Sequence, residues 1–289
     1  MTVFAVVLNW GREADSIACV DSLVANAFPL SQVILVDNAS PDGSGHRLHE
    51  RYPDAPYLQA GTNLGYAGGN NLGVAHALSL GATWVLVLNN DTICEPGMLA
   101  ALLEAGHADP RCAAVAPKIV RADDPTILWS DGGDFSPMRA LGRQRGGGTT
   151  DILPEQRSPA ACSFLTGCCL LLRAEAIARY DELFRAEYFA YVEDAELAIR
   201  LQRDGWRLVY QPHARLRHKV PPTGTLPPPW ALQRRDRNRR RLAAEHFGPL
   251  AYLRFAAWFY PTRLLTIAVY LARGDGARAR AVLDGAFGR

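Results

Sequence analysis

The sequence predicts an α/β fold with a mostly parallel central sheet. Short apolar runs typical of buried strands, at Val3–Leu8, Val33–Val36 and Trp84–Leu88, alternate with segments of helical periodicity such as Ser16–Ala25 and Leu72–Leu80. Strands that alternate with helices form βαβ units, and the carboxyl ends of their parallel strands share one edge of the sheet. We therefore expect the polar residues that follow these strands to meet at one ligand-binding edge.

The rest of the chain carries weaker signals. The segment 130–150 is rich in Gly and Arg, so we expect a mobile loop or a lobe boundary there. The proline-rich segment 221–229 interrupts the chain before an arginine-rich tail. Further helices are expected at Gly43–Tyr52, Pro96–Gly106 and Asp194–Arg203, a buried run at Phe164–Arg173, and strands at Ala113–Ala116 and Leu208–Tyr210.

Composition and charge narrow the class of protein. The chain has 289 residues, of which 48% are hydrophobic, so it can bury a large core. Residues 211–289 hold 15 Lys and Arg against 4 Asp and Glu, while residues 1–210 hold 16 against 25. A basic tail on an acidic body suggests that the tail faces phosphate or a membrane surface.

The six cysteines form no CxxC pair, which predicts buried reduced thiols and a reducing compartment. The N-terminal apolar run lacks the basic leader and cleavage site of a signal peptide and is too short to span a bilayer. We therefore expect a cytoplasmic protein.

Three stretches could hold a nucleotide or a metal ion. Asp37 follows the strand VILV and could accept the imide N–H of a uracil or thymine ring, although it could equally be a turn acid. The stretch GTNLGYAGGNN, residues 61–71, would let backbone N–H groups approach a phosphate or a sugar, and its alternative is an ordinary turn. In VLVLNNDTICEP, residues 85–96, a buried strand ends at two amides and a carboxylate, which form either a polar exit loop or a site.

The stretch YFAYVEDAELAIR places acids at the start of a predicted helix, among aromatic residues that include Tyr191. A carboxylate beside aromatic rings is partly desolvated and therefore more basic, so this stretch holds a candidate general base. The alternative is a solvated first turn whose acids are favoured by the helix dipole. His218, in ARLRHKV, is structural unless a second ligand accompanies it.

Taken together, LNW, VDNASPDGS, NLGYAGGNN, LNNDT, TGCCLL and YVEDAELAIRLQRDGWRLVYQPHARLRH resemble the inverting family 2 glycosyltransferases, particularly bacterial rhamnosyltransferase-like members. The resemblance runs in order from Val3 to His218. It implies a GT-A fold and a role in cell-wall or polysaccharide biosynthesis. The implied catalytic domain is 1–220, with a nucleotide-binding half at 1–117 and an acceptor and catalytic half at 118–220. The Pro-rich linker and basic amphipathic helical tail follow at 221–289.

The resemblance also assigns roles to residues. Asp194 matches the catalytic base. Asp91 and His218, which lies 24 residues after Asp194, match the ligands of a divalent metal, Mn²⁺ or Mg²⁺. The first acid of the family's DxD site is replaced here by Asn89. The expected nucleotide-sugar contacts are Asn9, Asp37, Asn63, Gly65, Asn70, Asn71 and Asn90, and the expected acceptor or supporting residues are Glu193, Glu196, Thr166, Gly167 and Tyr191.

The implied reaction is metal-dependent transfer of rhamnose from dTDP-rhamnose to a hydroxyl of a glycan or lipid-linked acceptor. A UDP-hexose donor is an alternative, since Asp37 would recognise uracil and thymine alike. A noncatalytic sugar-nucleotide-binding module is another, because Asn89 and Glu196 depart from the usual acids. A glycoside hydrolase would need no strand-end metal site, and a nucleotidyltransferase would need a basic glycine-rich signature that the sequence lacks.

The tail suggests a membrane partner. It contains the arginine cluster Arg234, Arg235, Arg237, Arg239, Arg240 and Arg241. The apolar stretch that follows, Leu250–Leu271, is interrupted by Arg254, Pro261 and Arg263, so we expect it to lie on the inner face of the plasma membrane rather than to span it. The alternative is a helical cap packed on the catalytic core. Nucleic-acid binding is not expected, because no recognised motif accompanies the arginines.

Overall fold

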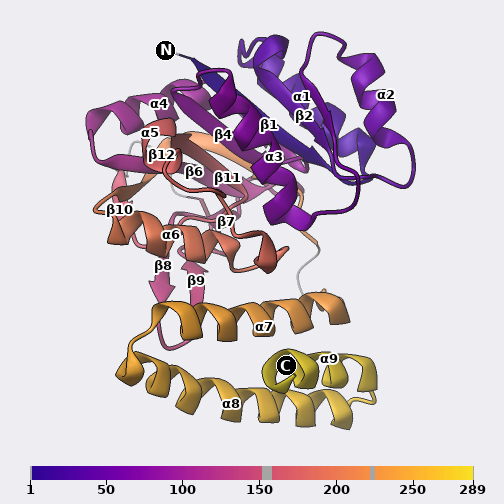
Figure 1. Cartoon of the computed structure of the whole chain (residues 1–289), viewed down its shortest axis with the longest axis vertical. Helices are drawn as coiled ribbons and strands as arrows, with labels where there is room; N and C mark the ends of the chain where they lie inside the picture. Colours follow the sequence, from indigo (N-terminus) through magenta and orange to yellow (C-terminus); the bar gives the residue numbers. More distant parts are fainter. Residues whose placement is uncertain (1, 152–157, 222–224, 289) are drawn as a thin grey trace.

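The protein is a sheet domain with a layer of helices beneath it (Figure 1). The computed structural model describes residues 2–151, 158–221 and 225–288. In this part of the chain, one ten-stranded sheet has the path order β10-β12-β6-β11-β4-β1-β2-β3, with β5 paired to β12 and β7 to β6. A two-stranded sheet, β8-β9, extends towards the helical layer (Figure 1).

The first half of the chain forms the parallel region that the sequence predicts. Its strands are β1 (Val3–Asn9), β2 (Val33–Asp37), β3 (Tyr57–Gln59) and β4 (Trp84–Asn89), connected by α1 (Glu13–Ala25), α2 (Ser44–Arg51) and α3 (Gly65–Ser79). These four strands run parallel to one another. Asn9 lies opposite Asp37, and Leu8 lies opposite Asn89, so the polar strand ends meet at one edge.

The second half makes the sheet mixed. Its elements are β5 (Thr92–Cys94), α4 (Met98–Ala108), β6 (Cys112–Arg121), β7 (Leu128–Ser130), β10 (Ala160–Cys162), β11 (Cys169–Arg173), α5 (Ala174–Ile177), α6 (Glu193–Arg203) and β12 (Arg207–His218). Strand β11 runs antiparallel between β4 and β6, and β12 runs parallel to β6. Strand β6 passes through residue 117, so the two expected halves share a strand.

Strand β12 is longer than the predicted Leu208–Tyr210. Its last residues alternate between buried Leu216 and His218 and exposed Arg217, which is the period-two pattern of a half-buried strand. The charged residues obscured this continuation in the sequence. The extension carries His218 to the polar edge, where it lies opposite Thr92 of β5.

The Gly- and Arg-rich segment 130–150, where the sequence suggests a mobile loop or a lobe boundary, contains a hairpin. Its strands are β8 (Gly133–Ser136) and β9 (Leu141–Gln144), and Arg145 forms an ion pair with Asp134 at 2.5 Å. At the turn, Ala140 is buried in one cluster with Leu242 and Phe255 of the tail. The hairpin therefore joins the sheet domain to the helical layer.

Helix α3 begins at Gly65, inside the stretch that the sequence presents as a loop. Gly65 has a φ of +72°, and an added Cβ would lie 2.4 Å from the carbonyl oxygen of Phe189. An added Cβ at Gly73 would lie 2.3 Å from Val6 of β1. These glycines therefore permit close packing of α3, in addition to any part they play at the site.

The tail forms α7 (Pro229–His246), α8 (Pro249–Ala272) and α9 (Gly276–Phe287). Leu242 and Ala243 of α7 share a buried cluster with Tyr188 and Val192 of the sheet domain, so α7 packs on the core. This packing matches the alternative of a helical cap on the core, which the sequence alone does not decide. The outer side of α8 is different, because many of its leucines are exposed.

The arginines of α7 do not form one surface. Arg239 is buried and pairs with buried Asp236 at 2.8 Å, and Arg263 of α8 contacts the same carboxylate at 3.1 Å. Arg240 donates to the carbonyl oxygen of Gly288 at the end of α9, at 2.6 Å. Part of the basic cluster therefore holds the tail together. All six cysteines are free and buried, as the sequence predicts.

Candidate active site

A cavity of about 600 Å³ opens at the polar edge of the sheet. Of the residues predicted to bind a nucleotide sugar, Asn63, Gly65 and Asn90 line it, and so does Asp91. The walls also include residues that the sequence did not single out for a site, namely Trp10, Arg12, Asn38, Tyr66, Phe189, Ala190 and Trp230. The cavity thus combines amides, aromatic rings and one cation at the place where parallel strands end, where α/β sheets bind ligands.

The two predicted metal ligands lie side by side. Asp91 Oδ1 is 3.2 Å from His218 Nε2, and Arg12 Nη1 is 3.4 Å from Asp91 Oδ2. Burial raises the pKa of Asp91, but His218 and Arg12 outweigh it and leave the pKa below its usual value. Burial lowers the pKa of His218, but Cys168 and Asp91 raise it to about 10. Without a metal ion the imidazole therefore holds a proton next to the carboxylate, and a metal ion bound by His218 would have to displace that proton.

A divalent cation fits this pair if its other ligands come from elsewhere. Asp91 Oδ1 is buried and accepts no well-aligned hydrogen bond, so an acceptor oxygen is available. Within residues 2–151, 158–221 and 225–288, no group of three or more His, Cys, Asp or Glu side chains converges on one point. One carboxylate and one imidazole would need diphosphate and water oxygens to complete the shell.

Asn9 and Asp37 lie behind the cavity wall. Asn9 Nδ2 donates to Asp37 Oδ1 at 3.2 Å, and Gln59 Nε2 donates to Asp37 Oδ2 at 2.8 Å. Ser40 also donates to this carboxylate. Both oxygens of the Asp37 carboxylate therefore already accept hydrogen bonds from neighbouring residues. To accept an N–H group of a nucleotide base, the carboxylate would have to release the hydrogen bond from the amide of Gln59.

The asparagines of the 61–71 stretch divide into two groups. Asn63 faces the cavity and accepts a hydrogen bond from Asn38 Nδ2 at 3.1 Å. Asn71 exchanges two hydrogen bonds with the backbone of Phe184, at 2.6 and 2.9 Å, and Asn70 donates to the carbonyl oxygen of Tyr66 at 2.8 Å. Asn70 and Asn71 are absent from the cavity wall and fix the backbone instead.

A second cavity, of about 270 Å³, contains the predicted base. Three of the residues assigned to the acceptor side, Thr166, Tyr191 and Glu193, line it together with Asp194. Helix α7 contributes Arg235, which the sequence did not single out for this site. Gly167 is outside the wall but contacts Asp194 through its backbone N–H.

Asp194 is connected to the first cavity by two hydrogen bonds. Gly167 N donates to Asp194 Oδ2 at 3.0 Å, and Tyr66 Oη donates to the carbonyl oxygen of Gly167 at 2.6 Å. Because Tyr66 lines the first cavity, this chain fixes the position of the carboxylate relative to a ligand bound there. An added Cβ at Gly167 would lie 3.1 Å from Tyr66 Oη, so the contact needs a small residue.

Burial makes both acids of this cavity more basic. Burial raises the pKa of Asp194, and the backbone N–H groups of Gly167 and Ala195 only partly oppose it. Burial and the charge of Asp194 raise the pKa of Glu193 well above its usual value. Glu193 is 6% exposed, and its Oε2 has no hydrogen-bond partner among the described residues. Both carboxyl groups therefore hold a proton more strongly than exposed acids do.

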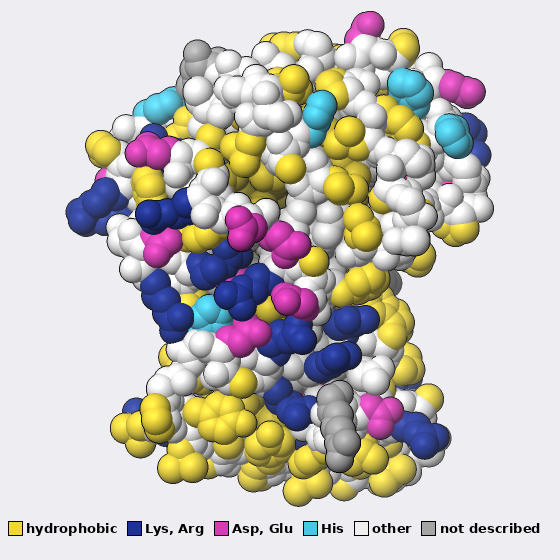
Figure 2. All heavy atoms as spheres, viewed as in Figure 1, with side chains coloured by type: hydrophobic (Ala, Val, Ile, Leu, Met, Phe, Trp, Pro, Cys, Tyr) yellow, Lys and Arg dark blue, Asp and Glu magenta, His cyan; other side chains and the backbone are white. Residues whose placement is uncertain are grey.

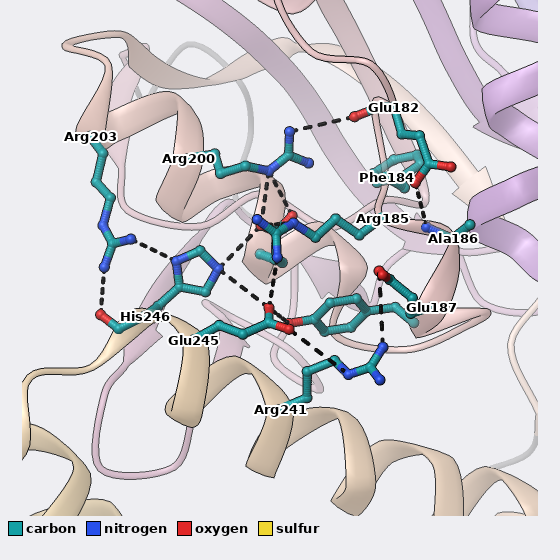
Figure 3. Close-up of polar contacts among 12 residues, drawn as sticks. Glu182, Phe184, Arg185, Ala186, Glu187, Arg200, Arg203, Arg241, Glu245 and His246 are labelled. Carbon is teal, nitrogen blue, oxygen red and sulfur yellow. Dashed lines mark hydrogen bonds and ion pairs between the residues drawn. The ribbon is translucent and has the colours of Figure 1, made fainter.

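Glu196 faces away from this cavity. It is fully buried, and it lies 2.8 Å from Arg200 Nε, 3.2 Å from His246 Nε2 and 3.3 Å from Arg185 Nε. Figure 3 shows Arg200 of α6, Arg185 and, at the end of α7, His246 lying close to one another. Glu196 therefore attaches α6 to the tail, which explains why the longer side chain is accommodated there.

The loop between the two cavities has an unusual backbone. Phe189, Tyr191 and Val192 have φ angles of +60°, +71° and +75°, a region that side chains with a Cβ rarely adopt. Asn238 Nδ2, from α7, donates to the carbonyl oxygens of Tyr188, Ala190 and Tyr191, at 2.8, 3.0 and 2.8 Å.

This loop is a wall shared by both cavities. Phe189 and Ala190 line the first cavity, and Tyr191 and Val192 line the second. Asp194 follows two residues later, at the start of α6. In the sequence, Asn238 is a single amide within a run of arginines, and nothing else there indicates that it contacts this loop.

The mixed sheet, the cavity at the strand ends and the acid beside it define a GT-A type glycosyltransferase. Two solved structures share the fold. The mannosyltransferase PcManGT from Pyrobaculum calidifontis, in complex with GDP-Man and Mn²⁺, aligns with a TM-score of 0.59 and 17% identity, covering 98% of this chain and 85% of that one. GalNAc-T7 with UDP, GalNAc and Mn²⁺ aligns with a TM-score of 0.65 and 14% identity, covering 97% and 54%.

The family model for glycosyl transferase family 2 matches residues 5–180, and the chain belongs to this family. It is 32% identical over 279 residues to an N-acetylglucosaminyl-diphospho-decaprenol L-rhamnosyltransferase of Mycobacterium tuberculosis, covering 90% of this chain and 86% of the relative. It is 31% identical over 229 residues to the galactofuranosyltransferase GlfT1 of the same species, covering 78% and 67%. The chain is therefore a glycosyltransferase, as the sequence predicts.

We expect Asp91→Ala to abolish the Mn²⁺-dependent part of nucleoside-diphosphate binding, because it removes the only carboxylate beside His218 in the described cavity wall. His218→Ala should weaken it less, since water can replace one imidazole. Calorimetric titration with and without Mn²⁺ measures both. Asp54→Ala, at an exposed acid, is the control. Wild-type metal dependence in Asp91→Ala would refute the assignment.

We expect Asn238→Leu, which keeps the size of the side chain but removes its donors, to lower kcat by about 10²-fold because the base is displaced. It should also lower the free energy of unfolding by about 1–3 kcal/mol, the usual effect of unpaired buried carbonyls. Gln233→Leu removes an exposed amide from the same helix and is the control. A loss of stability with unchanged kcat in the folded fraction would limit Asn238 to a structural role.

Proposed function

We propose that the protein is an inverting glycosyltransferase that moves rhamnose from a nucleoside diphosphate to a hydroxyl of a lipid-linked glycan. The position of Asp194 is the observation that carries this proposal. Asp194 lies in one cavity, and Tyr66 and Gly167 connect it to the other. A base on the acceptor side of a donor site is what a single displacement needs.

In this proposal, the acceptor hydroxyl enters the second cavity and donates its hydrogen bond to Asp194. As the hydroxyl oxygen attacks the anomeric carbon, its proton passes to the carboxylate. The bond between that carbon and the diphosphate oxygen breaks, and its electron pair leaves with the diphosphate. Attack from the side opposite the leaving group inverts the anomeric centre.

Asp91 and His218 would hold a divalent cation. When bound, such a cation neutralises the charge that develops on the leaving diphosphate. Arg12, 3.4 Å from Asp91, is placed to pair with the same anion. The aromatic rings of Trp10 and Trp230, both exposed at the cavity, would cover the donor.

The donor and the acceptor are suggested by the relatives. The mycobacterial relative is an L-rhamnosyltransferase named for an N-acetylglucosaminyl-diphospho-decaprenol substrate, which supports a rhamnose donor, dTDP-rhamnose in this proposal, and a lipid-linked sugar acceptor for this chain. The galactofuranosyltransferase relative supports a UDP-linked hexose as the alternative. Either donor is consistent with a role in cell-wall polysaccharide synthesis.

We expect Asp194→Asn to lower turnover by about 10²–10⁴-fold while donor binding survives, because the amide keeps the shape of the carboxylate but cannot accept the proton. Wild-type turnover should fall as the pH decreases through the raised pKa of Asp194, so its acid limb should lie above the ordinary aspartate value of 3.8. Rates of nucleoside-diphosphate release measure both effects.

Asp181→Asn, at an exposed acid, is the matched control for that measurement. Comparing dTDP-rhamnose with UDP-hexoses in the wild type decides the donor. Unchanged turnover in Asp194→Asn would move the role of base to Glu193. Donor binding without turnover on every lipid-linked acceptor would favour the noncatalytic module.

We further propose that α8 attaches the enzyme to the inner face of the plasma membrane. In the described part of the chain, α8 is the one helix long and apolar enough to cross a membrane, and 17% of its most apolar window is buried. Leu253 and Leu265 are 66% exposed. Figure 2 shows hydrophobic side chains gathered over the lower face of the molecule. Because Arg263 is tied to buried Asp236, α8 would lie along the surface rather than span it.

We expect Leu253→Asp/Leu265→Asp to release the full-length chain from liposomes, because it places two charges on the apolar face. Co-sedimentation with anionic and neutral liposomes measures this, and binding to anionic liposomes should weaken with salt. Leu80→Asp, at an exposed leucine of the sheet domain, is the control. Equal partitioning of all three proteins would contradict membrane attachment through α8.

A further inference from the structure

We propose that Arg234, Arg235 and Arg237 of α7 form an anion site that binds the phosphate groups of the acceptor. The inference rests on the proposed function, because it gives the lipid-linked acceptor a phosphate next to its sugar. It adds what the fold and the relatives leave open: which residues of this chain recognise that phosphate.

These three arginines have no carboxylate partner. Within residues 2–151, 158–221 and 225–288, no Asp or Glu oxygen lies within 4.0 Å of their guanidinium nitrogens, although other arginines of the same helix are paired. Arg239 pairs with Asp236, and Arg241 lies near Glu187 and Glu245. Unpaired cations clustered within one turn of a helix repel one another, so an anion bound among them would be stabilised.

The surroundings of Arg234 show this repulsion. Its guanidinium lies over the ring of Phe189, with Cζ 4.7 Å from the ring centroid. Burial lowers the pKa of Arg234, and the charges of Arg237 and Arg241 lower it further. Stacking on the ring holds the guanidinium in place and leaves its edge free for oxygen ligands.

Arg235 places one member of the cluster in the wall of the proposed acceptor cavity. It lines the second cavity together with Asp194 and Glu193, and its Nε is buried without a hydrogen-bond partner. Arg234 and Arg237 lie within one helical turn of it, about 5 Å along the axis. A sugar in the second cavity would therefore have its own phosphate beside these side chains.

The acceptor phosphate fits this cluster better than the donor diphosphate does. Asp91 and Arg12 are the charged residues of the first cavity wall, with His218 beside Asp91, and Arg235 lies in the second, beyond the 189–192 wall. Helix α8, which follows α7 in the chain, carries exposed leucines. Figure 2 shows basic side chains interspersed with acidic ones at the waist of the molecule, above the apolar lower face. The sugar of the acceptor would thus lie in the second cavity, its phosphate at the three arginines, and its lipid at the exposed leucines of α8.

The test compares two detergent-solubilised acceptors with the same terminal sugar and the same lipid. One carries a diphosphate between sugar and lipid, and the other carries a direct glycosidic bond. We expect the wild type to have a kcat/KM at least tenfold higher for the diphosphate acceptor. In Arg234→Gln/Arg237→Gln this preference should fall to about one. The exposed pair Arg273→Gln/Arg280→Gln has the same charge change and should keep the preference.

Retention of the preference in Arg234→Gln/Arg237→Gln would overturn the inference. An equal loss on both acceptors, with a higher KM for the donor, would also overturn it, because the arginines would then serve the donor diphosphate. Absence of turnover on both acceptors in the wild type would count against the proposed function alone.

A binding measurement decides the anion site without turnover. Inorganic pyrophosphate, with a chelator present to exclude metal, should raise the melting temperature of the wild type. The shift should persist in Arg12→Gln, which alters the donor side, and disappear in Arg234→Gln/Arg237→Gln. A shift lost only in Arg12→Gln, or no shift in any protein, would refute an anion site on α7.

Discussion

The three hydrogen bonds from Asn238 to the 188–191 backbone are the interaction on which the site depends. Three residues of this loop occupy the left-handed region, at a cost of about 1–2 kcal/mol each. A buried amide that donates to three carbonyls holds that conformation. Because consecutive residues of the loop line both cavities, their backbone angles fix the orientation of Asp194 to the donor cavity.

Helix α7 of the tail therefore holds the loop that precedes Asp194. Asn238 lies on α7, between Asp236 and Arg239, whose buried ion pair also receives Arg263 of α8. Glu196 on α6 is attached to the end of the same helix through His246. A displacement of α8 would be transmitted through these buried charges to the loop beside the base. The surface that would meet the membrane and the loop that separates the cavities thus share one helix.

The sequence was most informative where periodicity and strand ends decide the structure. It located β1, β2 and β4 but not the short edge strand β3. It also grouped Asp91 with His218, and these two side chains lie 3.2 Å apart, although their role as metal ligands stays a prediction. It could not show that Asp37 is surrounded by Asn9, Ser40 and Gln59, since such networks depend on side-chain directions across three strands. Asn238 was equally hidden, because the three carbonyl groups that it contacts lie 47 to 50 residues earlier in the chain. The place of Arg235 in the wall of the second cavity was hidden for the same reason, because that wall is built from distant parts of the chain.

The charge asymmetry of the chain follows from a problem that such a transfer must solve. If donor and acceptor both carry phosphate, two anions must approach one another, and their repulsion increases as the site excludes water. Cations lie on either side of the 189–192 wall. Arg12 lies beside Asp91 in the first cavity, and Arg235 lines the second. In the proposed function the cations on the acceptor side come from the basic tail, while the acidic body holds the carboxylates that would bind a metal ion and accept the proton.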